Sequence, residues 1–114
     1  MVDASMTVGE LRERVGQFVR ARDWERFHAP KDLATAISIE ASELLEIFLW
    51  RSVTPAEEIP PLDRASASEE LADIVIYGLS LANALHLDLS DAVLSKLKKD
   101  EAKYPVDRFR GVPP

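Results

Sequence analysis

The sequence contains no cysteine. This excludes disulfide bonds, thiolate metal sites and a cysteine nucleophile. It also has no apolar run long enough to cross a bilayer, and its first twelve residues lack the apolar core of a signal peptide. We therefore expect a cytoplasmic protein with no membrane partner. Repeats and low-complexity tracts are absent too, and no segment alternates polar and apolar residues as a half-exposed strand would.

Positive charge is also scarce, because the formal net charge is −6 over 114 residues. Binding to a nucleic-acid polymer usually requires a basic surface that displaces counterions from the phosphates, so we exclude this class of partner. A small phosphorylated substrate is not excluded. Carboxylates that hold divalent cations are locally much less negative than a count over the sequence indicates.

Apolar residues recur at helical spacing throughout the chain. A hydroxyl and a carboxylate three residues apart, Thr7 and Glu10, form a capping box that opens the first helix. We expect helices over about 7–22, 30–50, 66–87 and 88–104, with a possible turn near 56–58 and an irregular tail over 106–114. The length fits one domain spanning residues 1–114. The sequence therefore predicts an all-α fold of the four-helix bundle type.

The third predicted helix is apolar around most of its circumference, and a helix of this kind is normally buried. In a chain of this size, it is covered on all sides only if a second copy packs against it. The sequence therefore predicts a homo-oligomer, a dimer at least. The residues concerned are Leu71, Ile74, Val75, Ile76, Leu79, Leu81, Ala82 and Leu85.

Two of the predicted helices each carry a pair of acids three residues apart, so that both carboxylates of a pair project from one helical face. The pairs are Glu40 with Glu43 and Glu70 with Asp73. The same faces carry apolar and aromatic residues, among them Trp50 on the second helix and Tyr77 on the third. Solvent-exposed acidic faces are common, but acids that share a face with aromatics on two helices are less so.

Like charges one turn apart repel each other, and a buried carboxylate without a partner costs several kcal/mol. The two faces offer few cationic side chains, so a divalent metal ion is the natural compensation. Ligation by oxygen alone suits Mg²⁺, or Mn²⁺. A di-iron site is disfavoured because it needs a histidine three residues after a glutamate, and neither His28 nor His86 has that position.

The arrangement Glu40-x-x-Glu43 followed by Glu70-x-x-Asp73 resembles the MazG-like all-α nucleoside triphosphate pyrophosphohydrolases. Further segments are similar, in the same order, to the dCTP pyrophosphatase branch: 22–28, 46–50, 69–77, 95–96 and 103–106. The resemblance extends over about residues 11–111. It implies a Mg²⁺-dependent hydrolase, dimeric or tetrameric, that converts a nucleoside triphosphate such as dCTP to the monophosphate and pyrophosphate, with a role in nucleotide-pool control.

The resemblance also implies roles for individual residues. The metal ligands and catalytic acids are Glu40, Glu43, Glu70 and Asp73. The residues that enclose the nucleoside are Trp24, Phe27, His28, Trp50 and Tyr77, and the phosphate contacts are Lys31 and Lys96. One position departs from the branch. Residue 100 is an aspartate here, whereas asparagine is common at this position in the branch, and a carboxylate cannot donate the hydrogen bonds that an amide can.

Each of these side chains also has a simpler interpretation. Aromatic faces can stack on a base, but Phe27 is more typical of a core residue. His28 fits a ligand contact and a loop histidine equally well, and Lys96 lies among other lysines on what is normally a solvated face. One of the four acids, or the nearby Glu46, would accept the proton of the attacking water.

Two alternatives stay open. The first is a related pyrophosphohydrolase for another substrate, such as dUTP, a modified nucleotide or phosphoribosyl-ATP. The second is a non-catalytic helical dimer that binds nucleotides or a partner protein. The complete set of four acids favours an enzyme, because a pure nucleotide binder has no need to concentrate so much negative charge.

Overall fold

The computed structural model describes all residues, 1–114, and contains helices and no strands. The four main helices are α1 (Val8–Ala21), α2 (Pro30–Leu49), α3 (Pro61–Ala84) and α4 (Leu89–Lys103), and a short α5 (Val106–Phe109) follows. Single 3₁₀ turns cover Val2–Ala4, Glu25–Phe27 and Ala56–Glu58. The predicted all-α class is confirmed.

Local sequence signals explain most of the helix boundaries. The Thr7 hydroxyl accepts a hydrogen bond from the Glu10 N–H, and the Glu10 carboxylate accepts one from the Thr7 N–H, which completes the predicted capping box. The Asp88 carboxylate accepts a hydrogen bond from the Asp91 N–H and so caps α4. Two expectations are wrong. Helix α3 begins at Pro61 rather than near residue 66, because a proline in the first turn needs no N–H partner. The tail is not wholly irregular, since it contains α5.

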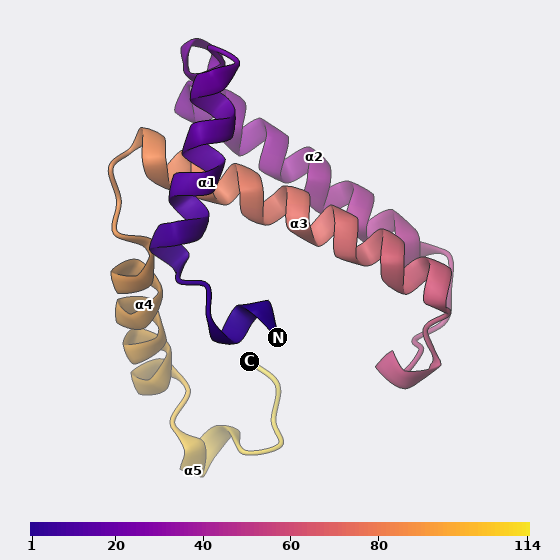
Figure 1. Ribbon diagram of the computed structural model, residues 1–114. Helices are drawn as coiled ribbons and strands as arrows, with labels where there is room; N and C mark the ends of the chain where they lie inside the picture. The colour runs from indigo at the N-terminus through magenta and orange to yellow at the C-terminus, as the bar shows by residue number, and fades with distance from the viewer.

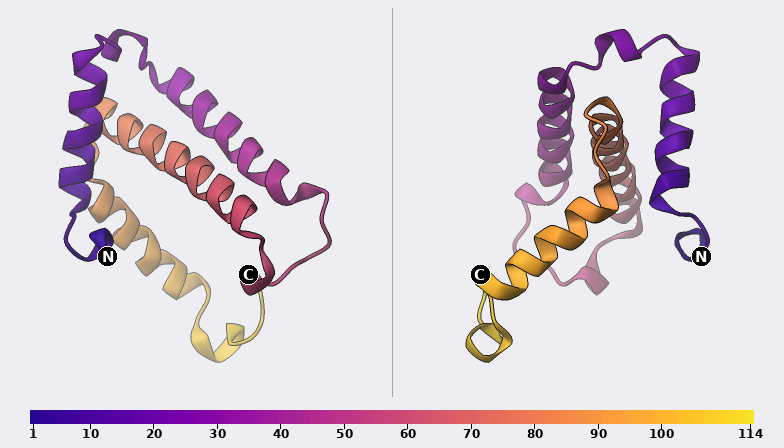
Figure 2. Two further views of the ribbon diagram at one scale, coloured as in Figure 1. Left: turned by 45° about the vertical axis from the view of Figure 1, so that its right-hand side comes forward. Right: turned by 90° about the vertical axis from the view of Figure 1, so that its left-hand side faces the viewer.

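Helices α2 and α3 are antiparallel and pack side by side, and α1 crosses the C-terminal half of α3 (Figure 1). Helix α4 turns away after α3 ends, and α5 lies at the far end of this arm (Figure 2). Helix α4 makes few contacts with the other helices. A single chain therefore supplies the four helices of a bundle but packs only three of them together.

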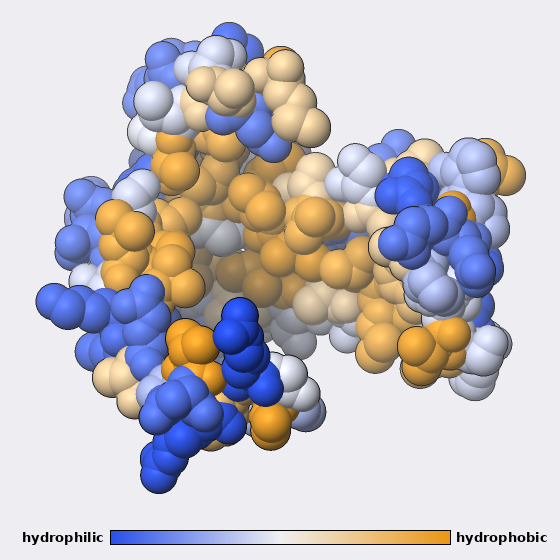
Figure 3. Space-filling view, turned by 90° about the horizontal axis from the view of Figure 1, so that it is seen from below, coloured by the Kyte–Doolittle hydropathy of each residue, from blue (hydrophilic) through white to orange (hydrophobic).

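The core of the single chain is small, with six of 114 residues buried. The radius of gyration is 17.0 Å, against about 13 Å for a compact chain of this length. On α3, Leu79 and Ala82 are buried, whereas Leu71 and Val75 are exposed. Apolar residues spread across the middle of the face seen from below (Figure 3). The apolar surface of α3 is thus only partly covered by its own chain.

The ends of α1 and α3 share an unusual feature, a non-glycine residue in the left-handed region, Asp23 (φ 52°) and His86 (φ 54°). At both ends the next residue donates its N–H back across the turn, Trp24 to the Val19 carbonyl at 3.1 Å and Leu87 to the Ala82 carbonyl. This hydrogen-bond pattern usually has glycine at the left-handed position.

We expect Asp23→Gly to increase the free energy of unfolding by about 1 kcal/mol, because glycine adopts this conformation without the steric cost of a Cβ atom. The ion pair that is lost, with Arg26, is solvent-exposed and contributes little. Urea denaturation at fixed protein concentration measures the change. Asp91→Gly, inside the first turn of α4, is the control and should destabilise the protein. A loss of stability in Asp23→Gly would contradict the expectation.

Candidate functional site

Three of the predicted acids converge where α2 packs on α3. Carboxylate oxygens of Glu40, Glu43 and Glu70 all lie within 4.8 Å of one another. Glu43 is exposed, whereas Glu40 and Glu70 are half-buried. One oxygen of each half-buried acid, Oε2, is shielded from solvent and has no hydrogen-bond partner. Asp73 lies one turn along α3 from Glu70, and its charge acts on both Glu40 and Glu70.

The surroundings of these acids shift their titration. Burial is the largest cause that raises the pKa of Glu40 to about 7, followed by hydrogen bonds with the carboxyls of Glu43 and Glu70 and by the charges of Glu43 and Asp73. Burial is also the first cause that raises the pKa of Glu70. Hydrogen bonds between carboxyls require a shared proton, so they are lost once all members are ionised. As the pH rises above 7, the cluster therefore loses its last shared proton and keeps its full negative charge.

The cluster has the chemical character of a site for a hard divalent cation. Its donors are all carboxylate oxygens, and two of them are buried without a partner. None of the ion pairs of the chain involves these residues, so no lysine or arginine compensates them. A cation between α2 and α3 would satisfy the unpartnered oxygens and remove the repulsion.

A pocket of about 230 Å³ lies beside the cluster and brings together four of the residues that the resemblance associates with a nucleoside. These are Trp24, Phe27, His28 and Tyr77. Trp24 is positioned by an edge-to-face contact with Phe18, whose ring centroid is 5.7 Å away. Phe27 is 62% exposed, so its interpretation as a core residue is wrong. His28 is half-buried in the pocket wall.

Three residues of α2 complete the pocket, namely Asp32, Leu33 and Ala36. Asp32 and Leu33 were not among the predicted site residues. Their helical spacing from Ala36 was the available signal, since residues three and four apart share a face.

The pocket and the acidic cluster are neighbours along the seam between α2 and α3. Ala36 precedes Glu40 by one turn on α2, and Tyr77 follows Asp73 by one turn on α3. The two helices are antiparallel (Figure 1). Ala36 and Tyr77 therefore lie on the same side of the acids along the seam. One turn is about 5.4 Å, so the lining of the pocket and the acids are one helical turn apart on both helices.

The other three predicted substrate contacts lie outside this pocket in the single chain. Trp50 is 84% exposed at the C-terminal cap of α2. Lys31 is exposed in the first turn of α2 and does not line the pocket. Lys96 is on α4, where its Nζ donates to a carboxylate oxygen of Asp100 at 2.8 Å, and this contact raises the pKa of Lys96. The aspartate that departs from the expected asparagine thus pairs with a lysine.

Comparison with known proteins identifies the family. The sequence profile of the MazG-like family matches residues 35–112, which include all four acids and Tyr77. The chain belongs to the MazG-like family. It is 42% identical over 107 residues to dCTP pyrophosphatase 1 of Mus musculus, covering 92% of this chain and 63% of that protein. The match to dCTP pyrophosphatase 1 of Homo sapiens is 40% over 108 residues, covering 91% and 62%. The chain therefore spans somewhat less than two thirds of the length of these relatives.

A solved structure supports this fold over most of the chain. A pyrophosphatase from Archaeoglobus fulgidus superimposes with a TM-score of 0.75 and 41% sequence identity, covering 85% of this chain and 91% of the other. The predicted family and its all-α fold are thereby confirmed. No helix of this MazG-like chain has both the length and the apolar character needed to cross a membrane.

Proposed function

We propose that this chain is a Mg²⁺-dependent nucleoside triphosphate pyrophosphohydrolase, which converts a deoxynucleoside triphosphate and water to the monophosphate and pyrophosphate. One observation carries the proposal, namely the aromatic pocket that lies one helical turn from a cluster of partly buried, uncompensated carboxylates. The relatives named dCTP pyrophosphatase 1 favour dCTP, or a related modified deoxynucleotide, as the substrate.

In this proposal the residues of the seam divide the work. Trp24, Phe27, His28 and Tyr77 enclose the base, and the four acids hold Mg²⁺; Mn²⁺ also suits their oxygen donors. The ion, when bound, supplies charge neutralisation for the triphosphate and lowers the pKa of a water molecule. The carboxylates orient that ion and accept the proton of the water, while the pocket fixes the nucleoside so that a phosphate lies over the cluster.

The proposal includes a homo-oligomer, a dimer or a tetramer. The apolar stripe of α4 is exposed in the single chain at Val93, Leu94 and Leu97, as is much of α3. Surfaces of this kind are normally covered in the functional assembly. A second copy would also provide the route by which Lys96 and Trp50, which lie outside the pocket of their own chain, reach a substrate as the resemblance implies.

The assembly leads to a test. We expect the wild-type protein to sediment as a dimer or larger at micromolar concentration, because burying the stripes of α3 and α4 removes a large apolar area from water. The double variant Leu94→Glu/Leu97→Glu should shift toward the monomer and lose activity. Lys99→Glu changes charge on a different face of α4 and serves as the control. A monomeric wild-type protein would contradict the proposed assembly.

The reaction itself is tested with a panel of nucleotides. The protein is incubated with Mg²⁺ and dCTP, dUTP, a modified deoxycytidine triphosphate or phosphoribosyl-ATP, and the products are separated by anion exchange. We expect the monophosphate and pyrophosphate in equal amounts, with dCTP or its modified form the best substrate. Release of orthophosphate would contradict the reaction class. Nucleotide binding without any turnover would instead favour the non-catalytic helical dimer.

A further inference from the structure

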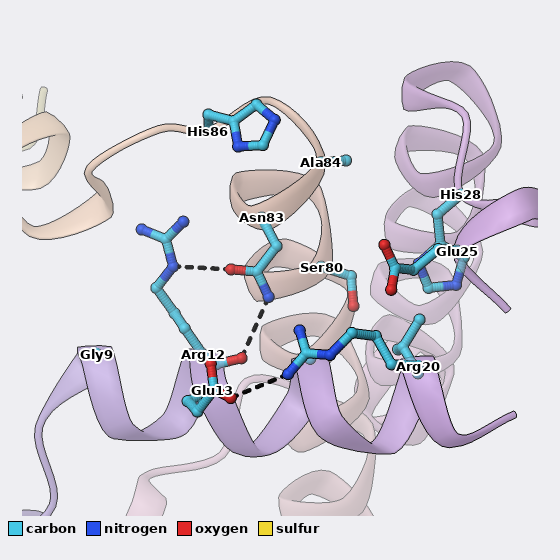
Figure 4. Close-up of a pocket in the computed structure, with 12 residues that line it drawn as sticks. Gly9, Arg12, Glu13, Arg20, Glu25, His28, Ser80, Asn83, Ala84 and His86 are labelled. Carbon is cyan, nitrogen blue, oxygen red and sulfur yellow. Dashed lines mark hydrogen bonds and ion pairs between the residues drawn. The ribbon is translucent and has the colours of Figure 1, made fainter. Parts of the chain in front are cut away.

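A cavity of about 750 Å³ lies where α1 crosses α3, apart from the proposed metal cluster. None of the four acids lines it, and it shares only His28 with the aromatic pocket. Its wall is mostly polar, and Figure 4 shows Arg12 and Arg20 of α1 extending toward Asn83 and Ser80 of α3. A hollow with several converging hydrogen-bond donors is typical of a ligand site.

One side of the cavity is held rigidly. The Arg12 Nε–H donates to the Asn83 Oδ1 at 3.0 Å, and the Asn83 amide donates back to the Arg12 carbonyl at 3.2 Å. A second guanidinium N–H of Arg12 donates to the Leu87 carbonyl. All these partners are neutral. The Arg12 charge is therefore fixed in place but has no carboxylate partner.

A glycine of α1, Gly16, lines the cavity beneath the Arg20 guanidinium. Arg20 donates through Nη2 to Glu13 at 2.9 Å, while its Nη1 lies over Gly16. A Cβ atom at Gly16 would be only 2.9 Å from that nitrogen. Glycine is unfavourable inside a helix, but here it leaves space for the guanidinium. The ion pair with Glu13 is solvent-exposed, and such pairs are weak enough to rearrange.

The opposite wall contributes a buried hydroxyl. Ser80 is only 5% exposed. Its side chain points into the cavity, toward the Arg20 guanidinium (Figure 4), and makes no hydrogen bond within the chain. This hydroxyl is consequently available to a ligand.

We infer that this cavity binds a phosphate-type oxyanion, which accepts hydrogen bonds from Arg12, Arg20 and Ser80. Arginine and hydroxyl donors are the groups that proteins commonly use for phosphate. Two carboxylates line the same cavity. Glu13 is paired with Arg20 and would have to release that guanidinium to the anion, and Glu25 lies beside His28 on the side of the cavity where Ser80 stands (Figure 4). The site is separate from the proposed metal cluster and does not depend on it.

The test is made with a chelator present, so that metal-mediated binding at the acidic cluster does not contribute. Inorganic phosphate, pyrophosphate and deoxycytidine monophosphate are each titrated by calorimetry up to about 10 mM. We expect saturable binding of at least one of them. Preference for the free oxyanions would identify a free phosphate as the ligand, and preference for the monophosphate would identify a nucleotide-borne one. No saturable binding of any probe would overturn the inference.

Two variants locate the binding. Arg20→Gln and Ser80→Ala should each weaken the affinity about tenfold, the size expected for one hydrogen bond to a charged group. Arg14→Gln removes the same charge from α1 without altering the cavity lining, and should leave the affinity unchanged. Circular dichroism verifies that each variant is folded. Equal affinities in wild type, Arg20→Gln and Ser80→Ala would show that the anion binds elsewhere and would refute the assignment.

Discussion

Replacing Glu43 by glutamine is expected to reduce Mg²⁺-dependent hydrolysis by about 100- to 1000-fold, the size of losing one strong electrostatic contact at the reacting phosphate. Glu43 is the exposed member of the three-carboxylate cluster. Its carboxyl and its charge both raise the pKa values of Glu40 and Glu70. The variant therefore removes a proposed metal ligand and, at the same time, relieves repulsion within the metal-free protein.

The variant should change activity and stability in opposite directions, and this distinguishes a metal ligand from a residue that the fold needs. Activity should fall, while the free energy of unfolding without metal should stay the same or increase. Hydrolysis rates across a Mg²⁺ titration, together with urea denaturation in a chelator, measure both. Glu69→Gln changes an exposed acid of α3 outside the cluster and should preserve activity. Retained activity in Glu43→Gln would refute the ligand assignment.

Helix positions followed from the sequence wherever a local signal determines them. Thr7 and Glu10 were predicted to open α1, and they do. The helix predicted over 88–104 is α4, whose cap is Asp88. The start of α3 was missed because two consecutive prolines resemble a loop, whereas Pro61 occupies the first helical turn. The path of α4 away from the bundle depends on tertiary packing, which no local pattern encodes.

The site was predictable to the extent that it is built along single helices. Spacing placed Glu40 and Glu43 on one face, and Glu70 and Asp73 on another. The structure brings the carboxylates of three of these acids within 4.8 Å and places Asp73 one turn away. Trp50 was predicted to share the face of Glu40 and Glu43, but α2 ends at Leu49 and the Trp50 side chain is exposed.

The cavity between α1 and α3 was not foreseen. It combines side chains about seventy residues apart in the sequence, such as Arg12 and Asn83. Neither residue belongs to a recognisable local pattern. Contacts of this kind become visible only after the crossing of the two helices is known.

The second large effect concerns pH. The stability of the metal-free protein should fall as the pH rises, whereas its affinity for Mg²⁺ should increase. The pKa of Glu40 is raised from an ordinary 4.5 to about 7, so between these values the folded protein binds a proton that the unfolded chain has lost. The contribution of this group to stability is therefore complete below about pH 4.5 and is lost as the pH rises through 7. In a chelator, the wild-type protein should lose stability relative to Glu40→Gln over this interval.

Metal binding should follow the opposite course, because the cation binds the ionised carboxylate and displaces its proton. Below pH 7, the affinity for Mg²⁺ is expected to rise by up to about tenfold per pH unit, and to level off above it. Calorimetric Mg²⁺ titrations in buffers of different ionisation enthalpy measure both the affinity and the protons released. Glu69→Gln should retain the wild-type dependence, whereas Glu40→Gln should bind weakly at every pH. A wild-type affinity that is constant between pH 5 and 8 would contradict both the raised pKa of Glu40 and its place among the ligands.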